Sequence, residues 1–205
     1  MSKDAMPPTV FVVDDDEDMR DSIQWLMESV GLPAQTFPGA GEFLQACDPL
    51  REGCLLLDVR MPGMSGMELL EQLNACGIQL PVIILTGHGD VPMAVRALKH
   101  GAFDFIQKPY NGQGLLDQVN AALKLDRERR RQSREMSALH AHYQALTQRE
   151  REIMELVVAG DSSKAIAKML GISPKTVDIH RANIMKKLDV HTIAELVQSR
   201  LTLRG

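Results

Sequence analysis

The sequence predicts a doubly wound α/β domain with a five-stranded parallel sheet, followed by a small all-α domain that contains a helix-turn-helix. Short apolar runs alternate with helical patterns over residues 1–125, and polar side chains follow most of these runs. Short helical patterns joined by tight turns fill residues 147–205. Strands that alternate with helices through short loops are typical of a parallel sheet covered on both faces.

The apolar runs that predict the five strands cover residues 10–13, 34–37, 54–57, 81–85 and 103–106. Apart from the short 34–37 run, their β-branched and leucine residues indicate strands buried on both faces. Apolar residues at helical spacing predict helices over 19–30, 66–74, 91–99 and 115–125, with a brief helix through Phe43 and Leu44. We expect the strand order 2-1-3-4-5 with right-handed crossovers.

Polar side chains stand where the strands end. Asp14 and Asp15 follow the first run, Asp58 the third, Thr86 the fourth, and Lys108 comes shortly after the fifth. Ligands of an open parallel sheet bind outside the carboxyl ends of its strands. The expected strand order places Asp14 and Asp15 beside Asp58, so these residues predict one site at one edge.

The residue types at this edge point to phosphoryl chemistry. Three converging carboxylates repel one another unless a cation joins them, and oxygen ligands suit Mg²⁺. Asp58 ends the central strand and is the expected nucleophile, because carboxylates form aspartyl phosphates. Lys108 offers a cation and Thr86 a hydroxyl donor to a phosphoryl group.

The last part of the chain carries a succession of helix signals. Thr147 and Glu150 form a capping-box pattern before a helix that ends at Gly160, and Ser162 or Ser163 can cap the next helix. A turn at 171–173 then leads into a longer helix over 174–188, and a last helix is predicted over 192–201. Helix, short glycine-containing turn and longer helix make the helix-turn-helix pattern.

The segment between the domains is highly charged. Residues 126–135 read DRERRRQSRE, and apolar residues return at helical spacing only from Met136 onward. A helix that continues from 115–125 is favoured over a frayed linker, because no Gly or Pro occurs between Gly114 and Gly160. The predicted domains are therefore 1–125 and 147–205, with a helical linker over 126–146.

Composition indicates a cytoplasmic protein with two different kinds of partner. Hydrophobic residues make up 44% of the chain, yet no apolar stretch approaches the ~20 residues that span a bilayer. Cys47, Cys54 and Cys76 show no CxxC spacing and are expected to be reduced thiols. Residues 1–125 hold 8 basic and 17 acidic side chains, whereas residues 147–205 hold 10 and 7.

Motifs at both ends resemble bacterial two-component response regulators of the FixJ type. The loop DVRMPGMSG at 58–66 and the Lys108-Pro109 pair resemble the receiver domain, and TGHGDVPMA at 86–94 is similar to the FixJ branch. The segments ISPKTV at 172–177 and HRANIM at 180–185 resemble the LuxR-type DNA-binding module. The resemblance covers residues 9–125 and the C-terminal domain in the expected order.

The resemblance implies roles for individual residues at the receiver site. Asp58 would accept a phosphoryl group from a histidine kinase, and Asp15, Asp58 and the backbone carbonyl of Arg60 would bind Mg²⁺ directly, with Asp14 assisting through water. Phe105 occupies the aromatic switch position. Family members usually have a cis peptide at the Lys-Pro pair. Asp16 is expected at the surface, and His88 is expected to make loop hydrogen bonds rather than to act in catalysis.

The resemblance also implies how the protein would work as a whole. A phosphorylation-dependent homodimer would form through the face built from 91–101 and 103–105, and two linked modules would occupy half-sites about one helical turn apart. RNA polymerase is a further expected partner. Such a bacterial regulator would be no enzyme beyond its own phosphorylation and dephosphorylation.

The second helix of the helix-turn-helix is expected in a major groove, with its N-terminal residues at base edges. The expected contacts to bases or phosphates are Lys175, Thr176, Asp178, His180, Arg181, Lys186 and Lys187, of which the last two suit phosphates. Val177, Ile179 and Ile184 are expected to be partly core. Asp178 would either accept from cytosine N4 or repel wrong sites, and both alternatives stay open.

The C-terminal segment departs from the common LuxR-type pattern at three positions. Ser163 stands where Asn is frequent, Ala165 where Glu is frequent, and Ile193 where Arg is frequent.

Other function classes fit the sequence less well. A phosphatase or phosphomutase with Asp58 as nucleophile would resemble haloacid-dehalogenase-like enzymes, which usually carry a second Asp two residues later, where this chain has Arg60. A constitutive DNA-binding regulator with a scaffolding receiver would not need the set of acids, Thr86 and Lys108. A small helical protein-interaction bundle is the alternative for residues 147–205.

Overall fold

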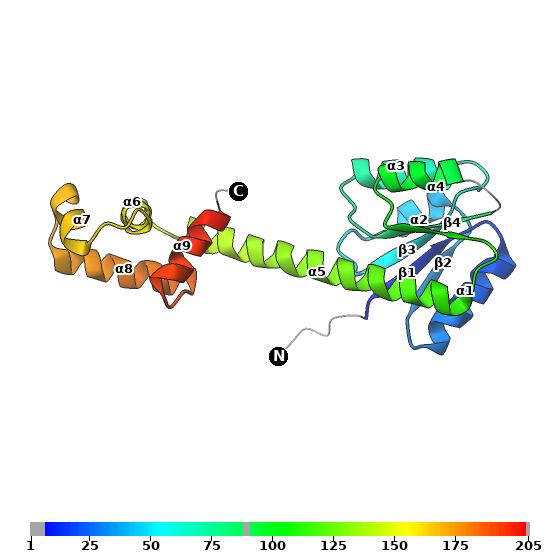
Figure 1. Cartoon of the computed structure of the whole chain (residues 1–205), viewed down its shortest axis with the longest axis horizontal. Coiled ribbons are helices and arrows are strands. Elements are labelled where there is room, and N and C mark those ends of the chain that lie inside the picture. Colours follow the sequence, from blue (N-terminus) through cyan, green and yellow to red (C-terminus); the bar gives the residue numbers. More distant parts are fainter. Residues whose placement is uncertain (1–6, 88–90, 204–205) are drawn as a thin grey trace. The chain divides into compact units, whose positions relative to one another are not determined.

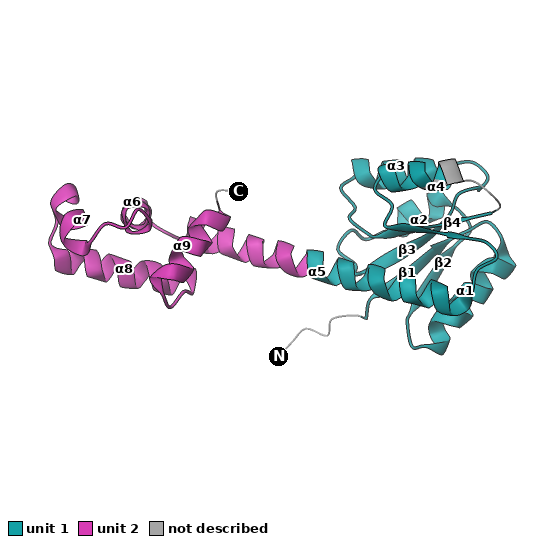
Figure 2. Ribbon diagram, in the orientation of Figure 1, with its two compact units in different colours: residues 1–129 teal, residues 130–205 magenta. Residues whose placement is uncertain are grey.

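The structure is a computed structural model, and it describes residues 7–87 and 91–203. The chain divides into two compact units, Met1–Arg129 and Arg130–Gly205 (Figure 2). Helix α5 (Gly112–Gln144) begins in the first unit and ends in the second. No helix of the described part of the chain is both long and apolar enough to cross a membrane.

The first unit is built on a five-stranded parallel sheet with the order β2-β1-β3-β4-β5, which confirms the prediction. Figure 1 labels strands β1 to β4 of this sheet. The strands are β1 (Thr9–Val13), β2 (Ala34–Phe37), β3 (Gly53–Asp58), β4 (Val82–Thr86) and β5 (Asp104–Gln107). Val13 pairs with Leu57 of β3, and Asp58 pairs with Leu85 of β4. This register brings the carboxyl ends of the three central strands to one edge.

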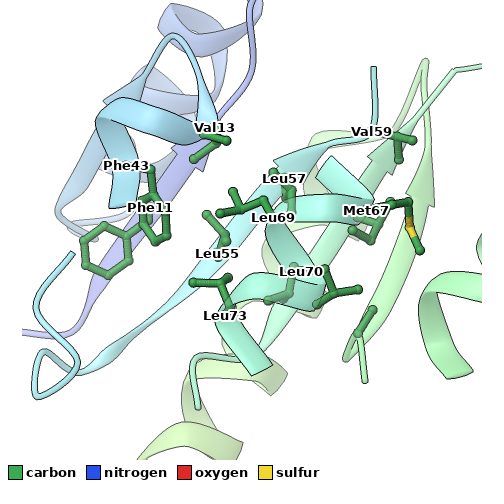
Figure 3. Packing of buried hydrophobic residues seen from close by; sticks show 14 of the residues in the cluster. Phe11, Val13, Phe43, Leu55, Leu57, Val59, Met67, Leu69, Leu70 and Leu73 are labelled. Carbon is green, nitrogen blue, oxygen red and sulfur yellow. The ribbon is translucent and has the colours of Figure 1, made fainter. Parts of the chain in front are cut away.

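Helices cover both faces of the sheet, and alternate side chains of each central strand enter opposite cores. Odd-numbered residues of β1 and β3, such as Phe11 and Leu55, pack against α2 (Ala40–Ala46) and α3 (Gly66–Ala75) (Figure 3). Even-numbered residues of these strands pack against α1 (Glu17–Ser29) and α5. Helix α4 (Val91–Lys99) contributes the buried Ala97 to the first of these cores.

Burial on both faces holds for the three central strands and fails at an edge. Every residue of β1, β3 and β4 is buried. In β5, by contrast, the Phe105 and Gln107 side chains are exposed, and Asp104 and Ile106 are only partly buried. The prediction of a doubly buried fifth strand was therefore wrong, because β5 pairs only with β4 and lies at the edge of the sheet.

The second unit holds four short helices packed on one core. They are α6 (Gln148–Val158), α7 (Ser163–Leu170), α8 (Pro174–Leu188) and α9 (Ile193–Thr202). The predicted capping box of Thr147 and Glu150 is present, and Ser162 caps α7 while Ser173 caps α8. Gly171 ends α7 in the left-handed conformation, with φ 65°, which a glycine adopts without strain.

The linker part of α5, residues 126–144, makes side-chain contacts with the first unit near its start and with the second unit near its end. The buried Asp126 side chain accepts a hydrogen bond from the Gly53 amide at 3.0 Å. In the second unit, the guanidinium groups of Arg151 and Arg200 lie 5.3 and 5.7 Å from the centre of the Tyr143 ring. Residues 126–144 are helical throughout, as the lack of Gly and Pro indicated.

Candidate functional site

The edge of the sheet where β1, β3 and β4 end gathers the polar residues that the sequence singled out. The Lys108 ammonium group donates to Asp14 Oδ2 at 2.6 Å and to Asp58 Oδ1 at 2.7 Å. Thr86 is the last residue of β4, the strand next to β3. Residues up to 94 positions apart in sequence therefore meet, because parallel strands end at the same edge.

Burial shifts the pKa values of two charged residues at this site, Asp14 and Lys108. Asp14 is 1% exposed and Asp58 7% exposed. Burial raises the pKa of Asp14, although hydrogen bonds from Lys108 and from the Asp16 amide oppose this shift. Burial also lowers the pKa of Lys108, but its bonds to Asp14 and Asp58 outweigh burial and leave that pKa raised. Lys108 is therefore a fixed cation between two carboxylates.

The loop after β3 holds the Asp58 carboxylate from the other side. The backbone amide of Arg60 donates to Asp58 Oδ2 at 2.7 Å, so the two carboxylate oxygens have different partners. The loop returns closely to the strand at Gly66, where an added Cβ would lie 2.1 Å from the carbonyl oxygen of Asp58. Only glycine fits there without displacing the backbone, so Gly66 shapes the loop around Asp58.

The acidic residues after β1 have three different environments. Asp14 points into the site, and its Oδ1 accepts from the Asp16 amide at 3.0 Å. Asp15 is exposed and takes no part in the bonds to Lys108. Asp16 is also exposed and caps α1 by accepting from the Met19 amide at 3.3 Å, which confirms its expected surface position.

Thr86 contacts Lys108 through its backbone, and Phe105 lies on β5, where it pairs with Ile84 of β4. The buried Thr86 donates its hydroxyl proton to the carbonyl of Gly87 at 3.3 Å, and its own carbonyl accepts from the Lys108 amide at 2.7 Å. The peptide bond between Lys108 and Pro109 is cis, as the resemblance implied. Phe105 is 39% exposed. His88 lies outside the described residues.

The donor set at this edge fits a hard cation. The carboxylates of Asp14, Asp15 and Asp58 and the carbonyl of Arg60 offer only oxygen, which Mg²⁺ prefers. Burial raises the pKa of Asp14 even though Lys108 binds its carboxylate. Within residues 7–87 and 91–203, no three His, Cys, Asp or Glu side chains gather as a metal site. Lys108 instead joins two of the acids, while the third is exposed.

Helix α8 carries the seven predicted DNA contacts, of which three are exposed. Lys175, Asp178 and Lys186 are exposed, and Thr176, His180 and Arg181 are partly buried. The buried Val177 and Ile184 belong to the core, as predicted.

Ile179 is 55% exposed, so the prediction that it is partly core was wrong. Residues two apart on a helix do not share a face, and the buried Val177, Ile184 and Leu188 define the inner face. That spacing is the sequence signal that could have identified Ile179 as a surface residue. Ile179 is thus an exposed apolar side chain on the helix that carries the predicted base contacts.

Lys187 is engaged inside its own domain. Its ammonium group donates to Glu150 Oε2 at 2.7 Å and to the Ala145 carbonyl at 3.3 Å. Glu150 is 4% exposed. Burial raises the pKa of Glu150, but hydrogen bonds from Lys187 and Thr147 outweigh burial and leave that pKa below its usual value. This ion pair joins α6 to α8, whereas Lys186 remains at the surface.

Together, the receiver-type sheet with its acid-lysine cluster and the capped helix-turn-helix define a response regulator. The family model described as "Response regulator receiver domain" matches residues 10–120, and that described as "Bacterial regulatory proteins, luxR family" matches residues 144–199. The chain belongs to the response regulators with a LuxR-type DNA-binding domain, and it is a transcriptional regulator. The predicted resemblance to FixJ-type proteins is confirmed.

Similar proteins share both domains with this chain. The transcriptional regulatory protein TdiR of Thauera aromatica is 47% identical over 204 residues, which cover 100% of this chain and 89% of TdiR. The transcriptional regulatory protein FixJ of Azorhizobium caulinodans is 46% identical over 192 residues, covering 94% and 91% of the two chains. The solved structure of the response regulator StyR is 46% identical, with a TM-score of 0.89 and coverage of 94% and 98%.

Proposed function

We propose that the protein accepts a phosphoryl group from a histidine kinase on Asp58 and then dimerises and binds promoter DNA in the bacterial cytoplasm. The observation that carries the proposal is the Lys108 ammonium group, 2.7 Å from Asp58 and 2.6 Å from Asp14. A carboxylate fixed by a partly buried cation at the end of a strand is suited to in-line attack on phosphorus. Beyond its own phosphorylation and dephosphorylation, the protein turns over no substrate.

Phosphoryl transfer involves one bond formed and one broken. An oxygen of the Asp58 carboxylate attacks the phosphorus of a phosphohistidine, so a P–O bond forms. The P–N bond breaks, and its electron pair returns to the imidazole ring. Lys108 balances the charge of a phosphoryl oxygen, and the Arg60 amide, which donates to Asp58 Oδ2 at 2.7 Å, orients the nucleophile.

Asp14, Asp15, Asp58 and the Arg60 carbonyl would hold Mg²⁺, which neutralises charge on the phosphoryl oxygens when bound. Asp15 is already exposed at this edge and is free to turn toward the site. Asp14 is buried and fixed by the Asp16 amide, which agrees with an assisting role.

Phosphorylation would change the surface next to the site. A phosphoryl group on Asp58 takes over the bond from Lys108 and attracts the Thr86 hydroxyl away from Gly87. Phe105 then rotates inward behind Thr86. Val95, Leu98 and Phe105 are 46%, 43% and 39% exposed, and this apolar exposure on α4 and β5 supports a homodimer surface.

Helix α8 would lie in the major groove. Lys175, Thr176, Asp178, His180 and Arg181 belong to its base-facing part, and Lys186 suits a phosphate. The exposed Ile179 suits the methyl group of a thymine. Lys187 is better explained by its ion pair with Glu150 than by a phosphate contact. RNA polymerase is the expected partner of the DNA-bound dimer.

The proposal is tested by genome-wide DNA capture with the full chain, with and without acetyl phosphate in magnesium buffer. We expect the phosphodonor to enrich a defined set of promoters. The Asp58→Asn variant should show no such enrichment, because an amide cannot accept the phosphoryl group. Equal capture by Asp58→Asn and the unchanged protein in response to acetyl phosphate would refute the proposed route.

A further inference from the structure

A short hydrogen-bond relay joins the two helices of the helix-turn-helix. Arg181 Nη1 on α8 donates to Ser163 Oγ on α7 at 2.9 Å, and Ser163 Oγ donates to Asp178 Oδ1 at 2.7 Å. Asp178 and Arg181 lie three residues apart, so both side chains leave the same face of α8. Ser163 occupies the position where LuxR-type modules frequently carry Asn, and its hydroxyl is the group that links the acid to the arginine.

The relay has a fixed direction. A serine hydroxyl has one proton to donate and can accept through its lone pairs. Arg181 can only donate, and the Asp178 carboxylate can only accept, so the proton of Ser163 points to Asp178. Oδ1 of Asp178 is therefore occupied, and Oδ2 keeps its capacity to accept. The nearby guanidinium also offsets the charge of Asp178, which lowers its repulsion by DNA phosphates.

Base chemistry selects the partner of such an oxygen. In the major groove, guanine presents only acceptors and thymine an acceptor and a methyl group, so a carboxylate is rejected by both. Adenine places its N6 donor beside the N7 acceptor, whereas the cytosine edge offers the N4 donor. Asp178 can only accept, and its Oδ1 is already bonded to Ser163, so its remaining oxygen favours the single N4 donor of cytosine.

We propose that Asp178 is a specificity-determining residue that accepts a hydrogen bond from cytosine N4, and that Ser163 and Arg181 are the positioning residues that aim it. This inference rests on the proposed function of α8 as the recognition helix. It decides between the two alternatives that the sequence left open for Asp178, in favour of direct recognition. It also assigns Arg181 an indirect role in place of its own base contact.

The test is selection from randomised duplexes with the full chain, acetyl phosphate and one fixed salt concentration. The unchanged protein should select a motif with cytosine at one position of each half-site. Asp178→Ala should reduce that preference about tenfold, within the usual effect of one specific base contact. Ser163→Ala and Arg181→Ala should weaken the preference at the same position and leave the other positions unchanged.

Two further variants make the test specific. Asp161→Asn removes one negative charge from the loop before α7 and should leave the motif unchanged. Asp178→Asn keeps the shape of the side chain and should shift the preference toward adenine, because Asn pairs with adenine N6 and N7. Thermal unfolding of each variant verifies that the domain is folded.

Three outcomes would overturn the inference. An Asp178→Ala protein with an unchanged motif would remove the direct contact and leave the proposed function standing. Equally tighter binding of Asp178→Ala to all sequences would show that Asp178 acts only by repulsion. Absence of any selected motif with the unchanged protein would overturn the proposed function together with this inference.

Discussion

At the residue scale, the site depends on one cation placed between two buried acids. Without Lys108, Asp14 and Asp58 would face each other in a poorly solvated position, since they are 1% and 7% exposed. Removing one partner from a buried ion pair leaves the other charge uncompensated, which costs about 3–5 kcal/mol in well-buried pairs. Lys108 is partly exposed, so its removal should cost less than this range for well-buried pairs.

We predict that Lys108→Ala lowers the free energy of unfolding by about 2 kcal/mol at neutral pH. The loss of stability should shrink as the pH falls through the raised pKa of Asp14, because protonation of Asp14 removes one of the two carboxylate charges that repel each other. Urea unfolding over a pH series measures this, with the exposed Lys124→Ala as control. A loss that stays constant with falling pH would contradict the account.

Lys108→Ala should also uncouple phosphorylation from dimerisation. The Asp58 carboxylate is still present in the variant, but the cation that redirects its bond to the phosphoryl group is gone. Size-exclusion chromatography with light scattering in acetyl phosphate reports the change. Dimerisation equal to that of the unchanged protein would count against the role of Lys108.

Which residues gather at the site could be predicted from the sequence, but side-chain direction could not. Parallel strands end at one edge of the sheet, so the apolar runs predict that Asp14, Asp58 and Lys108 gather there. Asp15 is exposed, because adjacent residues after a strand point in different directions. The engagement of Lys187 with Glu150 was missed, since no local pattern encodes a contact between residues 37 positions apart.

At the element scale, the β3–α3 loop and the α6–α8 pair each hold a functional helix or strand in place. The loop approaches β3 so closely that Gly66, the first residue of α3, lies against the backbone of Asp58. In the second unit, the pair of Glu150 and Lys187 ties α8, the predicted recognition helix, to α6. Element boundaries were largely predictable, because caps such as Thr147 and Ser173 mark them. The exposure of β5 was not, since edge position depends on the whole sheet.

We predict that Gly66→Ala destabilises the first unit by about 2–3 kcal/mol, because its Cβ would lie 2.1 Å from the Asp58 carbonyl oxygen. Phosphorylation of Asp58 by acetyl phosphate should be slower as well, since the loop that orients Asp58 must shift. Gly41→Ala in α2 is the matched control, because nothing lies within 4 Å of its added Cβ. Thermal unfolding and phosphorylation of the two variants are compared, and equal behaviour would contradict the account.

We predict that Glu150→Gln lowers the free energy of unfolding of the second domain by about 1–2 kcal/mol at neutral pH. Gln preserves the capping box, so the change isolates the charge. The folded state lowers the pKa of Glu150 from 4.5, so its stabilisation is full above that pH and is lost as the pH falls through the lowered pKa. Unfolding curves at several pH values measure the difference.

The control for this pair is Glu152→Gln. Glu152 bonds to Arg149 at 2.9 Å, but Glu152 is exposed where Glu150 is buried, so the loss should stay below about 0.5 kcal/mol. Equal losses in Glu150→Gln and Glu152→Gln would show that burial adds nothing to the α6–α8 pair.

At the scale of the whole molecule, the acidic site belongs to one compact unit and the LuxR-type domain to the other. The acidic first part carries the cluster of Asp14, Asp58 and Lys108, and the basic last part carries α8, the predicted recognition helix. Apolar side chains on α4 and β5 remain uncovered in the monomer, with Val95 and Leu98 nearly half exposed. Dimerisation through this surface is the step by which phosphorylation of Asp58 in the first unit would increase the DNA affinity of the second.

We predict that Leu98→Asp stays monomeric in acetyl phosphate while Asp58 is still phosphorylated, because a charge on the α4 surface opposes burial against a second copy. Trp25→Asp is the control: Trp25 is 80% exposed on α1, and its replacement should leave dimerisation intact. Light scattering and a phosphorylation gel read the two steps separately. A dimeric Leu98→Asp protein would move the interface elsewhere.

The central claim is that Asp58 carries the phosphoryl group that controls the protein. The most direct measurement is incubation of the full chain with radiolabelled acetyl phosphate in magnesium buffer, followed by counting of the label on the protein. We expect the unchanged protein to retain label. It should retain none when excess chelator is added before the donor, and Asp58→Asn should retain none in either case. A chain that never retains label, or an Asp58→Asn variant that retains it equally, would contradict the account.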